Sequence, residues 1–177
     1  MQSKFNRFLP LDEMIFRFEK GASWDKAKLL GFGEGSVIHE NSYVYGRPKI
    51  GKNVWIGPMT MIDGTGGLTI GDNCDISTGA FIVTHSTHPR LLTDGKSETV
   101  RAPVHIENNV YVGSKAVILP GVRVGHHSVV GVGAVVTHDA EPYSIIIGVP
   151  ARKVGKVLIQ PDGTAKLEYI KGGAGSE

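Results

Sequence analysis

The sequence predicts an all-β fold, a prism of short parallel β-coils with a triangular cross-section. Aliphatic residues recur every six positions, small or β-branched residues recur four positions after them, and the 177 residues include 24 glycines. A helix needs apolar positions about every 3.6 residues and a half-buried antiparallel strand about every 2, so a period of six fits neither element alone. If each hexad is one short strand and a corner, three hexads close one triangular coil. Residues eighteen apart then stack at about 4.8 Å.

Each hexad position has an expected place in the coil. The aliphatic position should form interior columns from Ile38, Val44, Ile50, Ile56, Ile62, Ile70, Ile76, Ile82, Ile106, Val112, Ile118, Val124, Val130 and Val136. The position four residues later should fill the space beside each corner, and it is held by Ser42, Val54, Thr60, Cys74, Ala80, Val110, Ala116, Val122, Ser128 and Ala134, with Pro48 as the rigid variant. Gly often follows the aliphatic residue directly, as at Gly51 and Gly113. We expect it to supply positive φ angles there.

The period is interrupted twice. Between Ile62 and Ile70 the step is eight residues, so the segment DGTGG adds two residues to one corner. Between Ile82 and Ile106 no interior pattern persists, and we expect residues 84–103 to leave the prism as an extruded loop. Long loops inside regular repeats are where functional residues tend to lie.

The extent of the six-residue repeat sets the domain boundaries. Residues 1–35 have helix-compatible spacing interrupted at Gly21, and Ser23 can N-cap a second short helix, so we expect a helical cap on the first coil. Residues 36–156 form the prism. Residues 157–177 are expected to form short strands about a PDGT turn, followed by a loose tail.

Composition restricts the partners and the compartment. A net charge of +2 with scattered basic residues argues against a nucleic-acid partner. Because Cys74 is the single cysteine, a disulfide framework and a cysteine-cluster zinc site are excluded. No run reaches about 18 apolar residues and the N-terminus does not resemble a signal peptide, so no membrane partner is expected and a cytoplasmic location is predicted.

The stretch VHIENNVYVGSKAVILPGVRVGHHSVVGVGAVVTHDAEPYSIIIGVPARKVGKV resembles the C-terminal half of the hexapeptide-repeat acyltransferases, which include galactoside, maltose, serine and nodulation-factor acetyltransferases. The resemblance covers residues from about 36 to 157. It implies a left-handed parallel β-helix and acetyl-CoA as co-substrate. The implied reaction is acetylation of a sugar hydroxyl, with N-acetylation of a nucleotide-linked amino sugar as the alternative. It also implies a homotrimer with active sites between subunits.

The resemblance implies a histidine base that acts directly on the acceptor. The extruded loop offers His85 and His88, and hexad counting favours His85, with His88 as the alternate base or a residue of the acceptor pocket. Asp63 occupies a position where relatives place an acceptor-contacting carboxylate. It could orient an acceptor hydroxyl or the imidazole, or it could be an Asp-Gly turn residue that bonds its own backbone.

The resemblance also implies a path for coenzyme A along the outer seam between prisms. Ser114, Val132, Thr137 and His138 should lie along that path, with Gly113 and Gly133 allowing close backbone approach. Arg152, Lys153 and Lys156 should meet the phosphates, which need cationic donors. Many relatives carry Lys at the position of His138.

Two other classes of protein use the same prism. A metal-dependent hydratase of the γ-carbonic-anhydrase type would use His85, His88 and His105 as zinc ligands, but their spacing does not match that group, and no metal is expected. A non-catalytic β-helical scaffold would not need the histidine loop or the basic GVPARKV segment. The acyltransferase hypothesis is therefore favoured over both.

Overall fold

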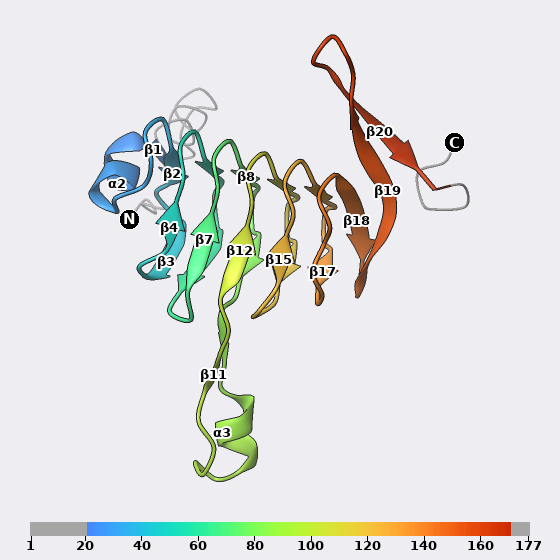
Figure 1. Cartoon of the computed structure of the whole chain (residues 1–177). Coiled ribbons are helices and arrows are strands. Elements are labelled where there is room, and N and C mark those ends of the chain that lie inside the picture. Colours follow the sequence, from blue (N-terminus) through green and yellow to red (C-terminus); the bar gives the residue numbers. More distant parts are fainter. Residues whose placement is uncertain (1–20, 171–177) are drawn as a thin grey trace, which may run out of the picture.

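The computed structural model describes residues 21–170, and its short strands form three sheets wound into one triangular prism (Figure 1). The chain passes from the first sheet to the second, then to the third, and back to the first, so neighbouring prism strands are parallel and belong to successive coils. The predicted fold class is confirmed. We call the turn from the first to the second sheet the first corner, from the second to the third the second corner, and from the third to the first the third corner.

The strands are short. The first sheet contains parallel strands β2 (Val37–His39), β5 (Trp55–Ile56), β8 (Asp75–Ile76), β13 (Tyr111–Val112), β16 (Val129–Val130) and β18 (Ser144–Gly148). The second contains β3 (Tyr43–Gly46), β6 (Met61–Gly64), β9 (Phe81–Ile82), β14 (Val117–Ile118) and β17 (Val135–Val136). The third contains β4 (Lys49–Ile50), β7 (Leu68–Ile70), β12 (Val104–Ile106) and β15 (Arg123–Val124).

The hexad positions fill the interior as the sequence predicts. Val112 and Val130, eighteen residues apart, pair in register and are 0% exposed. Burial of each such side chain stabilises the fold by roughly 1.5–3 kcal/mol. The small residues of the fifth hexad position are buried as well: Ser42, Val54, Thr60, Cys74, Ala80, Val110, Ala116, Val122, Ser128 and Ala134. Among the aliphatic positions, Val44 is only partly buried.

The expected role of the hexad glycines is wrong. Gly71 and Gly113, which directly follow aliphatic residues, do not have positive φ. They are needed because the coils approach closely: a Cβ on Gly113 would lie 2.7 Å from the Val132 nitrogen. The left-handed conformation falls two residues later, at third-corner residues such as Asn73 (φ 55°) and Asn109 (φ 59°). Asparagine tolerates this conformation better than other residues with a Cβ.

The first coil is covered by a short helix. Helix α2 (Trp24–Leu29) begins after Ser23, whose hydroxyl accepts a hydrogen bond of 3.0 Å from the Lys26 N–H, as the capping pattern predicts. Ala27 of this helix is buried against the core. Strand β1 (Ala22–Ser23), which pairs antiparallel with β2, was not expected. The predicted first helix falls in residues 1–20, outside the described residues.

The chain leaves the last coil through antiparallel strands. Strand β19 (Ala151–Ile159) pairs with β18 and then with β20 (Ala165–Tyr169), so the predicted turn at PDGT joins two strands. Strand β19 runs through the predicted boundary at residue 156, because the chain turns back after Gly148 and residues 151–156 pair antiparallel with β18 instead of starting another coil. Within residues 21–170, no helix is long and apolar enough to cross a membrane.

Residues 84–103 project from the prism as an arm (Figure 1). Strands β10 (His85–Ser86) and β11 (Val100–Arg101) pair antiparallel at its base, and helix α3 (His88–Leu92) lies toward its tip. The sequence predicts the departure from the prism but neither the two-stranded base nor the helix. A helix of five residues gives too short an apolar pattern to be recognised in a sequence.

Candidate active site

The two interruptions of the hexad pattern lie side by side at the second corner. Ile62 pairs with Ile82 in the second sheet, and Ile70 pairs with Ile106 in the third. The two-residue insertion of one coil and the arm of the next coil therefore leave the prism at the same corner. This arrangement brings Asp63 against His85, which is 22 residues away in sequence, with 2.6 Å between Asp63 Oδ2 and His85 Nδ1.

Asp63 is a buried carboxylate with a full set of donors. Its side chain is 1% exposed. Oδ1 accepts hydrogen bonds from the Thr65 N–H (2.9 Å) and the Thr65 hydroxyl (2.6 Å), and Oδ2 accepts from the Thr84 N–H (2.9 Å). Burial is the largest single influence and raises the pKa of Asp63, but the hydrogen bonds from Thr65, Thr84 and His85 together hold that pKa well below its usual range. The carboxylate is therefore ionised at neutral pH.

The carboxylate selects one tautomer of the imidazole. An ionised carboxylate can only accept hydrogen bonds, so Nδ1 of His85 carries a proton and its N–H donates a hydrogen bond to Asp63. The Nε2 atom is then unprotonated in the neutral ring and can accept a proton. The His85 side chain is 40% exposed, so this nitrogen can be reached from outside the protein. A buried carboxylate that orients a partly exposed imidazole is an arrangement suited to general-base chemistry.

Two of the contacts expected of Asp63 occur, on different oxygens, and its contact with an acceptor stays a prediction. The bond to the Thr65 N–H is the Asp-Gly turn interaction within the insertion, and the bond to His85 orients the imidazole. Thr65 and Thr84 are functional contacts that were not predicted from the sequence. The spacing of Thr65, two residues after an Asp, is a signal that could have found it, because Asp side chains commonly bond the backbone two residues on.

The insertion and the arm are also held together by their backbones. The Gly66 N–H donates a 2.8 Å hydrogen bond to the hydroxyl of Thr84, which is 0% exposed. A Cβ at position 66 would collide with the Thr84 carbonyl oxygen. Glycine at this position therefore allows the insertion to lie directly against the base of the arm.

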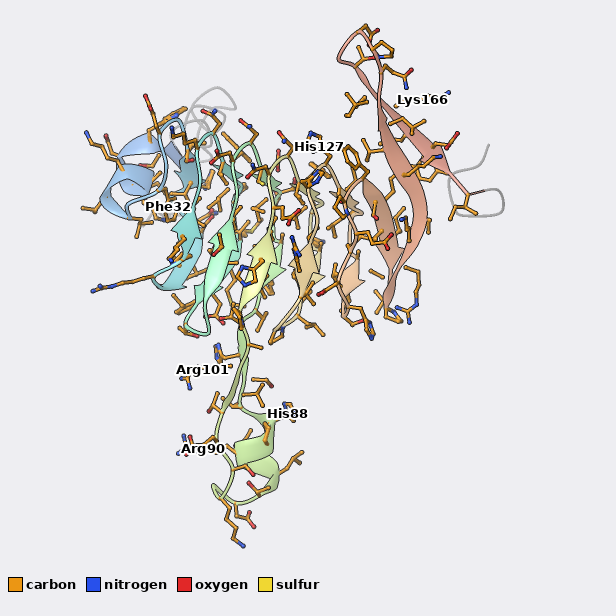
Figure 2. The ribbon with its side chains drawn as sticks, viewed as in Figure 1. Phe32, His88, Arg90, Arg101, His127 and Lys166 are labelled. Carbon is orange, nitrogen blue, oxygen red and sulfur yellow. The ribbon has the colours of Figure 1, made fainter. Side chains whose placement is uncertain are left out.

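His88 has different surroundings from His85. It is exposed and begins helix α3, and its Nδ1 lies 2.7 Å from the Ser86 hydroxyl. Figure 2 shows His88 on one side of the arm and Arg90 and Arg101 on the other. Its partner is a neutral hydroxyl, whereas His85 contacts a charged carboxylate.

Four of the residues predicted to contact coenzyme A are adjacent at the first corner. Gly113 and Ser114 follow β13, and Val132 and Gly133 lie beside them in the next coil. The Gly133 N–H donates to the Ser114 carbonyl oxygen at 2.9 Å. Val132 is 68% exposed, and nothing would lie within 4 Å of a Cβ on Gly133. Ser114, Val132 and Gly133 form an edge that an extended ligand can approach, whereas Gly113 is buried against the next coil instead of leaving room for a ligand.

The remaining predicted cofactor residues lie around the last coil. Thr137 and His138 follow β17 at the second corner, and the Thr137 hydroxyl lies 2.8 Å from His138 Nδ1. A hollow of about 460 Å³ is lined by His138, Arg152 and Lys153, among others. Lys153 pairs with Glu141 at 2.8 Å within this hollow. Lys156 instead pairs with Glu168 at 2.9 Å, so the structure gathers two of the three predicted cations there.

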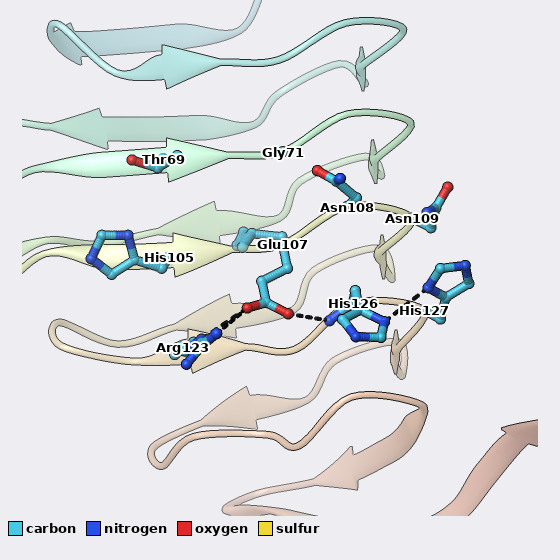
Figure 3. Close-up of a pocket in the computed structure, with 10 residues that line it drawn as sticks. Thr69, Gly71, His105, Glu107, Asn108, Asn109, Arg123, His126 and His127 are labelled. Atoms are coloured by element: carbon cyan, nitrogen blue, oxygen red, sulfur yellow. Dashed lines mark hydrogen bonds and ion pairs between the residues drawn. The ribbon is translucent and has the colours of Figure 1, made fainter.

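A separate groove of about 780 Å³ lies on the outer face of the third sheet (Figure 3). Its lining includes His105, Glu107, Arg123, His126 and His127 but neither Asp63 nor His85. Glu107 pairs with Arg123 and accepts a hydrogen bond from the His126 N–H at 2.8 Å, so the groove contains no uncompensated acid. Among residues 21–170, no three His, Cys, Asp or Glu side chains are grouped to hold a metal ion, and His85, His88 and His105 form no ligand set.

Two family models match the repeats. The model for "Bacterial transferase hexapeptide (six repeats)" matches residues 103–138, and the model for "Hexapeptide repeat of succinyl-transferase" matches residues 49–83. Both matched regions lie in the prism, and the resemblance to hexapeptide-repeat transferases that the motifs predict is confirmed.

Among curated proteins, this hexapeptide-repeat chain is 36% identical to galactoside O-acetyltransferase of Escherichia coli (strain K12) over 129 residues, 71% of this chain and 57% of that protein. It is 47% identical to chloramphenicol acetyltransferase of Klebsiella aerogenes over 63 residues, 36% of this chain and 30% of that protein. The chain thus spans less than two thirds of the length of these relatives.

Solved structures share the prism. An N-acyltransferase from Bacillus cereus, AntD, in complex with dTDP and 3-hydroxybutyryl-CoA, superposes with a TM-score of 0.62 and 20% identity, covering 75% of this chain and 87% of that chain. A hexapeptide-repeat acetyltransferase from Vibrio cholerae O1 biovar eltor, complexed with acetyl coenzyme A, superposes with a TM-score of 0.53 and 26% identity, covering 81% and 84%. The first similarity concerns the fold alone.

Proposed function

We propose that this protein is an acetyltransferase that moves the acetyl group of acetyl-CoA to a hydroxyl group of a saccharide. The observation that carries the proposal is the contact between the buried Asp63 carboxylate and His85 Nδ1. It leaves Nε2 free to accept the proton of an acceptor hydroxyl. The similarity to galactoside O-acetyltransferase supports a saccharide as the acceptor.

The reaction needs no covalent intermediate on the protein. His85 Nε2 takes the proton from the acceptor hydroxyl while the hydroxyl oxygen attacks the carbonyl carbon of the thioester. A tetrahedral intermediate forms. The carbon–sulfur bond then breaks, the sulfur takes the proton from the imidazolium, and coenzyme A leaves as the free thiol. Asp63 keeps the imidazole oriented and stabilises the positive charge that it acquires. His88 lies on the other side of the arm from Arg101, so its contact with the acceptor stays a prediction that the His88→Ala variant below tests.

The cofactor site would combine the first-corner edge with the last coil. Ser114, Val132 and Gly133 would lie along the pantetheine, which needs backbone groups and small side chains close by. Thr137, His138, Arg152 and Lys153 would meet the phosphates and ribose near the hollow. Lys153 and Lys156 are paired with Glu141 and Glu168, and each would bind phosphate once its exposed ion pair opens.

The position of these residues supports a homotrimer with sites between subunits. Ser114 and Val132 lie at the first corner, but His85 lies at the second, and one chain separates these corners by the width of the second sheet. A site that joins them would take the first-corner edge from a second copy. The outer face of the second sheet supports such packing, because it is a row of apolar side chains in register: Tyr43, Met61, Phe81, Val117 and Val135.

The test is release of free thiol from acetyl-CoA with neutral sugars, charged sugars, nucleotide-linked amino sugars and simple amines. Wild type, His85→Ala and His88→Ala would be compared at one pH. We expect His85→Ala alone to abolish acceptor-dependent release. Loss of release in His88→Ala alone would make His88 the base, and a preference for amines over hydroxyls would make the protein an N-acetyltransferase. Folded wild type that releases no thiol with any acceptor would contradict the proposal.

A further inference from the structure

Arg101 lies directly across the base of the arm from His85. Strands β10 and β11 pair antiparallel, with His85 opposite Arg101 and Ser86 opposite Val100. Side chains that face each other across an antiparallel pair project from the same face, with Cβ atoms about 4.5–5.5 Å apart. The guanidinium of Arg101 and the imidazole of His85 therefore belong to the same face of the arm.

Arg101 has no acidic partner among the described residues. Its side chain is exposed, and none of the ion pairs within residues 21–170 includes it. The carboxylate beside His85 is Asp63, but its Oδ1 already accepts two hydrogen bonds from Thr65 and its Oδ2 accepts from Thr84 and His85. The positive charge of Arg101 is therefore not needed to balance Asp63, and it is available to a ligand.

The arm has two distinct sides. Figure 2 shows Arg101 and Arg90 on one side and His88 on the other. Because His85 shares a face with Arg101, a ligand that reaches the His85 imidazole enters a positively charged environment. Arginine binds phosphate and carboxylate groups with a planar pair of N–H donors, and these hydrogen bonds are among the strongest that proteins make.

We propose that Arg101 binds an anionic group, a phosphate or a carboxylate, on the saccharide whose hydroxyl is presented to His85. The acceptor class would then be charged sugars such as sugar phosphates, nucleotide-linked sugars or uronic acids. This inference rests on the proposed function, since it assigns the acceptor of that same site. Arg101 is a specificity-determining residue in this scheme, and it takes no part in proton transfer.

The phosphates of coenzyme A are a poorer match for Arg101. The thioester must reach His85, and the phosphates lie at the far end of the pantetheine from the thioester. The hollow that gathers Arg152, Lys153 and His138 lies beyond β17, which is two strands from β9 in the second sheet, or roughly 10 Å at the usual strand spacing. Arg101 would therefore act on the acceptor, and its removal would leave the KM for acetyl-CoA unchanged.

The first experiment measures binding without acetyl-CoA. Calorimetric titrations would use galactose, galactose 1-phosphate and galacturonate, together with the matching glucose series, so that each ring is neutral, phosphorylated or carboxylated. We expect wild type to bind one charged form more tightly than its neutral partner. Arg101→Ala should weaken that binding by roughly tenfold to a hundredfold, and Arg101→Lys should restore part of it.

Arg90→Ala is the matched control, because it removes the same side chain from the same side of the arm but not from the position opposite His85. We expect it to change binding by less than about threefold, as is usual for an exposed charge. Equal losses in the two variants would show that the arm acts through its general charge, and this would overturn the proposal. Wild type that binds no charged sugar, or binds neutral sugars as well, would also overturn it.

Thiol release on the same sugars separates this inference from the proposed function. If Arg101→Ala lowers kcat/KM for charged acceptors, mainly by raising KM, the result supports both the anion site and the acetyltransferase proposal. Turnover of neutral acceptors that Arg101→Ala leaves unchanged overturns the inference alone. If charged sugars bind through Arg101 but cause no thiol release, the anion site is supported and the acetyltransferase proposal is overturned.

Discussion

The second and third corners of the same prism are built in opposite ways. At the third corner every coil turns alike, and Asn53, Asn73, Asn109 and His127 all take positive φ values between 53° and 59°. Each of these residues donates its N–H to a carbonyl of the preceding coil. At the second corner, one coil has two extra residues and the next carries the arm, and these irregular segments meet at Asp63 and His85.

The comparison separates residues that maintain the coil from residues that carry chemistry. A third-corner residue repeats the interactions of its neighbours above and below, so its contribution is local and small. Asp63 instead accepts hydrogen bonds from Thr65 of the insertion and from Thr84 and His85 of the arm. Substitutions at the third corner should therefore change stability alone, and substitutions at the second corner should change activity most.

The largest expected effect is at His85. In His85→Gln the base is lost, and we expect acceptor-dependent thiol release to fall by about 10²–10⁴, the usual contribution of a general base. The melting temperature should stay close to that of wild type, because the His85 side chain is 40% exposed and is not part of the core. Parallel assays and thermal denaturation measure both quantities. A variant that melts far below wild type would show that His85 also stabilises the second corner, and the functional difference between the two corners would no longer hold.

Ile76 lies in the strand that follows a third corner, and Ile82 lies in the strand that precedes the second corner. Removal of either interior side chain should have nearly the same effect on stability. Ile76 and Ile82 are 0% exposed, and each pairs with aliphatic residues on both sides. Replacing either with Ala should cost about 2–5 kcal/mol of unfolding free energy, measured by denaturant titration. Ile82 lies just before the arm, so only Ile82→Ala should also lower the activity of the folded protein. Equal losses of activity would show that the two corners are mechanically coupled.

The repeat could be predicted from sequence because each hexad is local. The columns that contain Val112 and Val130 follow from counting by six. The positive φ angles could not be placed by the same counting, because glycine appears in the hexads for its small size against the next coil. The contact between Asp63 and His85 depends on where two irregular segments end. The pairing of Arg101 with His85 depends on a strand register in the arm, where no repeat fixes it.

The charge of Asp63 should make part of the stability depend on pH. Its folded-state pKa is lowered, so its stabilising contribution is present above the ordinary Asp pKa of about 3.9 and is lost progressively as pH falls toward the folded-state value. In Asp63→Asn the carboxylate is absent at every pH. We therefore expect wild type to be more stable than this variant by about 1.5–3 kcal/mol near pH 7, with a difference that shrinks below about pH 4. A difference that is constant from pH 7 to pH 3 would show that shape, not charge, matters at position 63.

The smallest expected effect tests the third corner. Asn109 has φ 59° and its N–H bonds the Asp72 carbonyl oxygen at 2.9 Å. Alanine pays a larger penalty than asparagine or glycine in this conformation, so Asn109→Ala should lose about 1 kcal/mol and Asn109→Gly should lose less. Denaturant titration measures both, and thiol release by the folded variants should match wild type. A loss of activity in Asn109→Ala, restored in Asn109→Gly, would mean that the regular corner transmits strain to the site, because the backbone bond is kept in both variants.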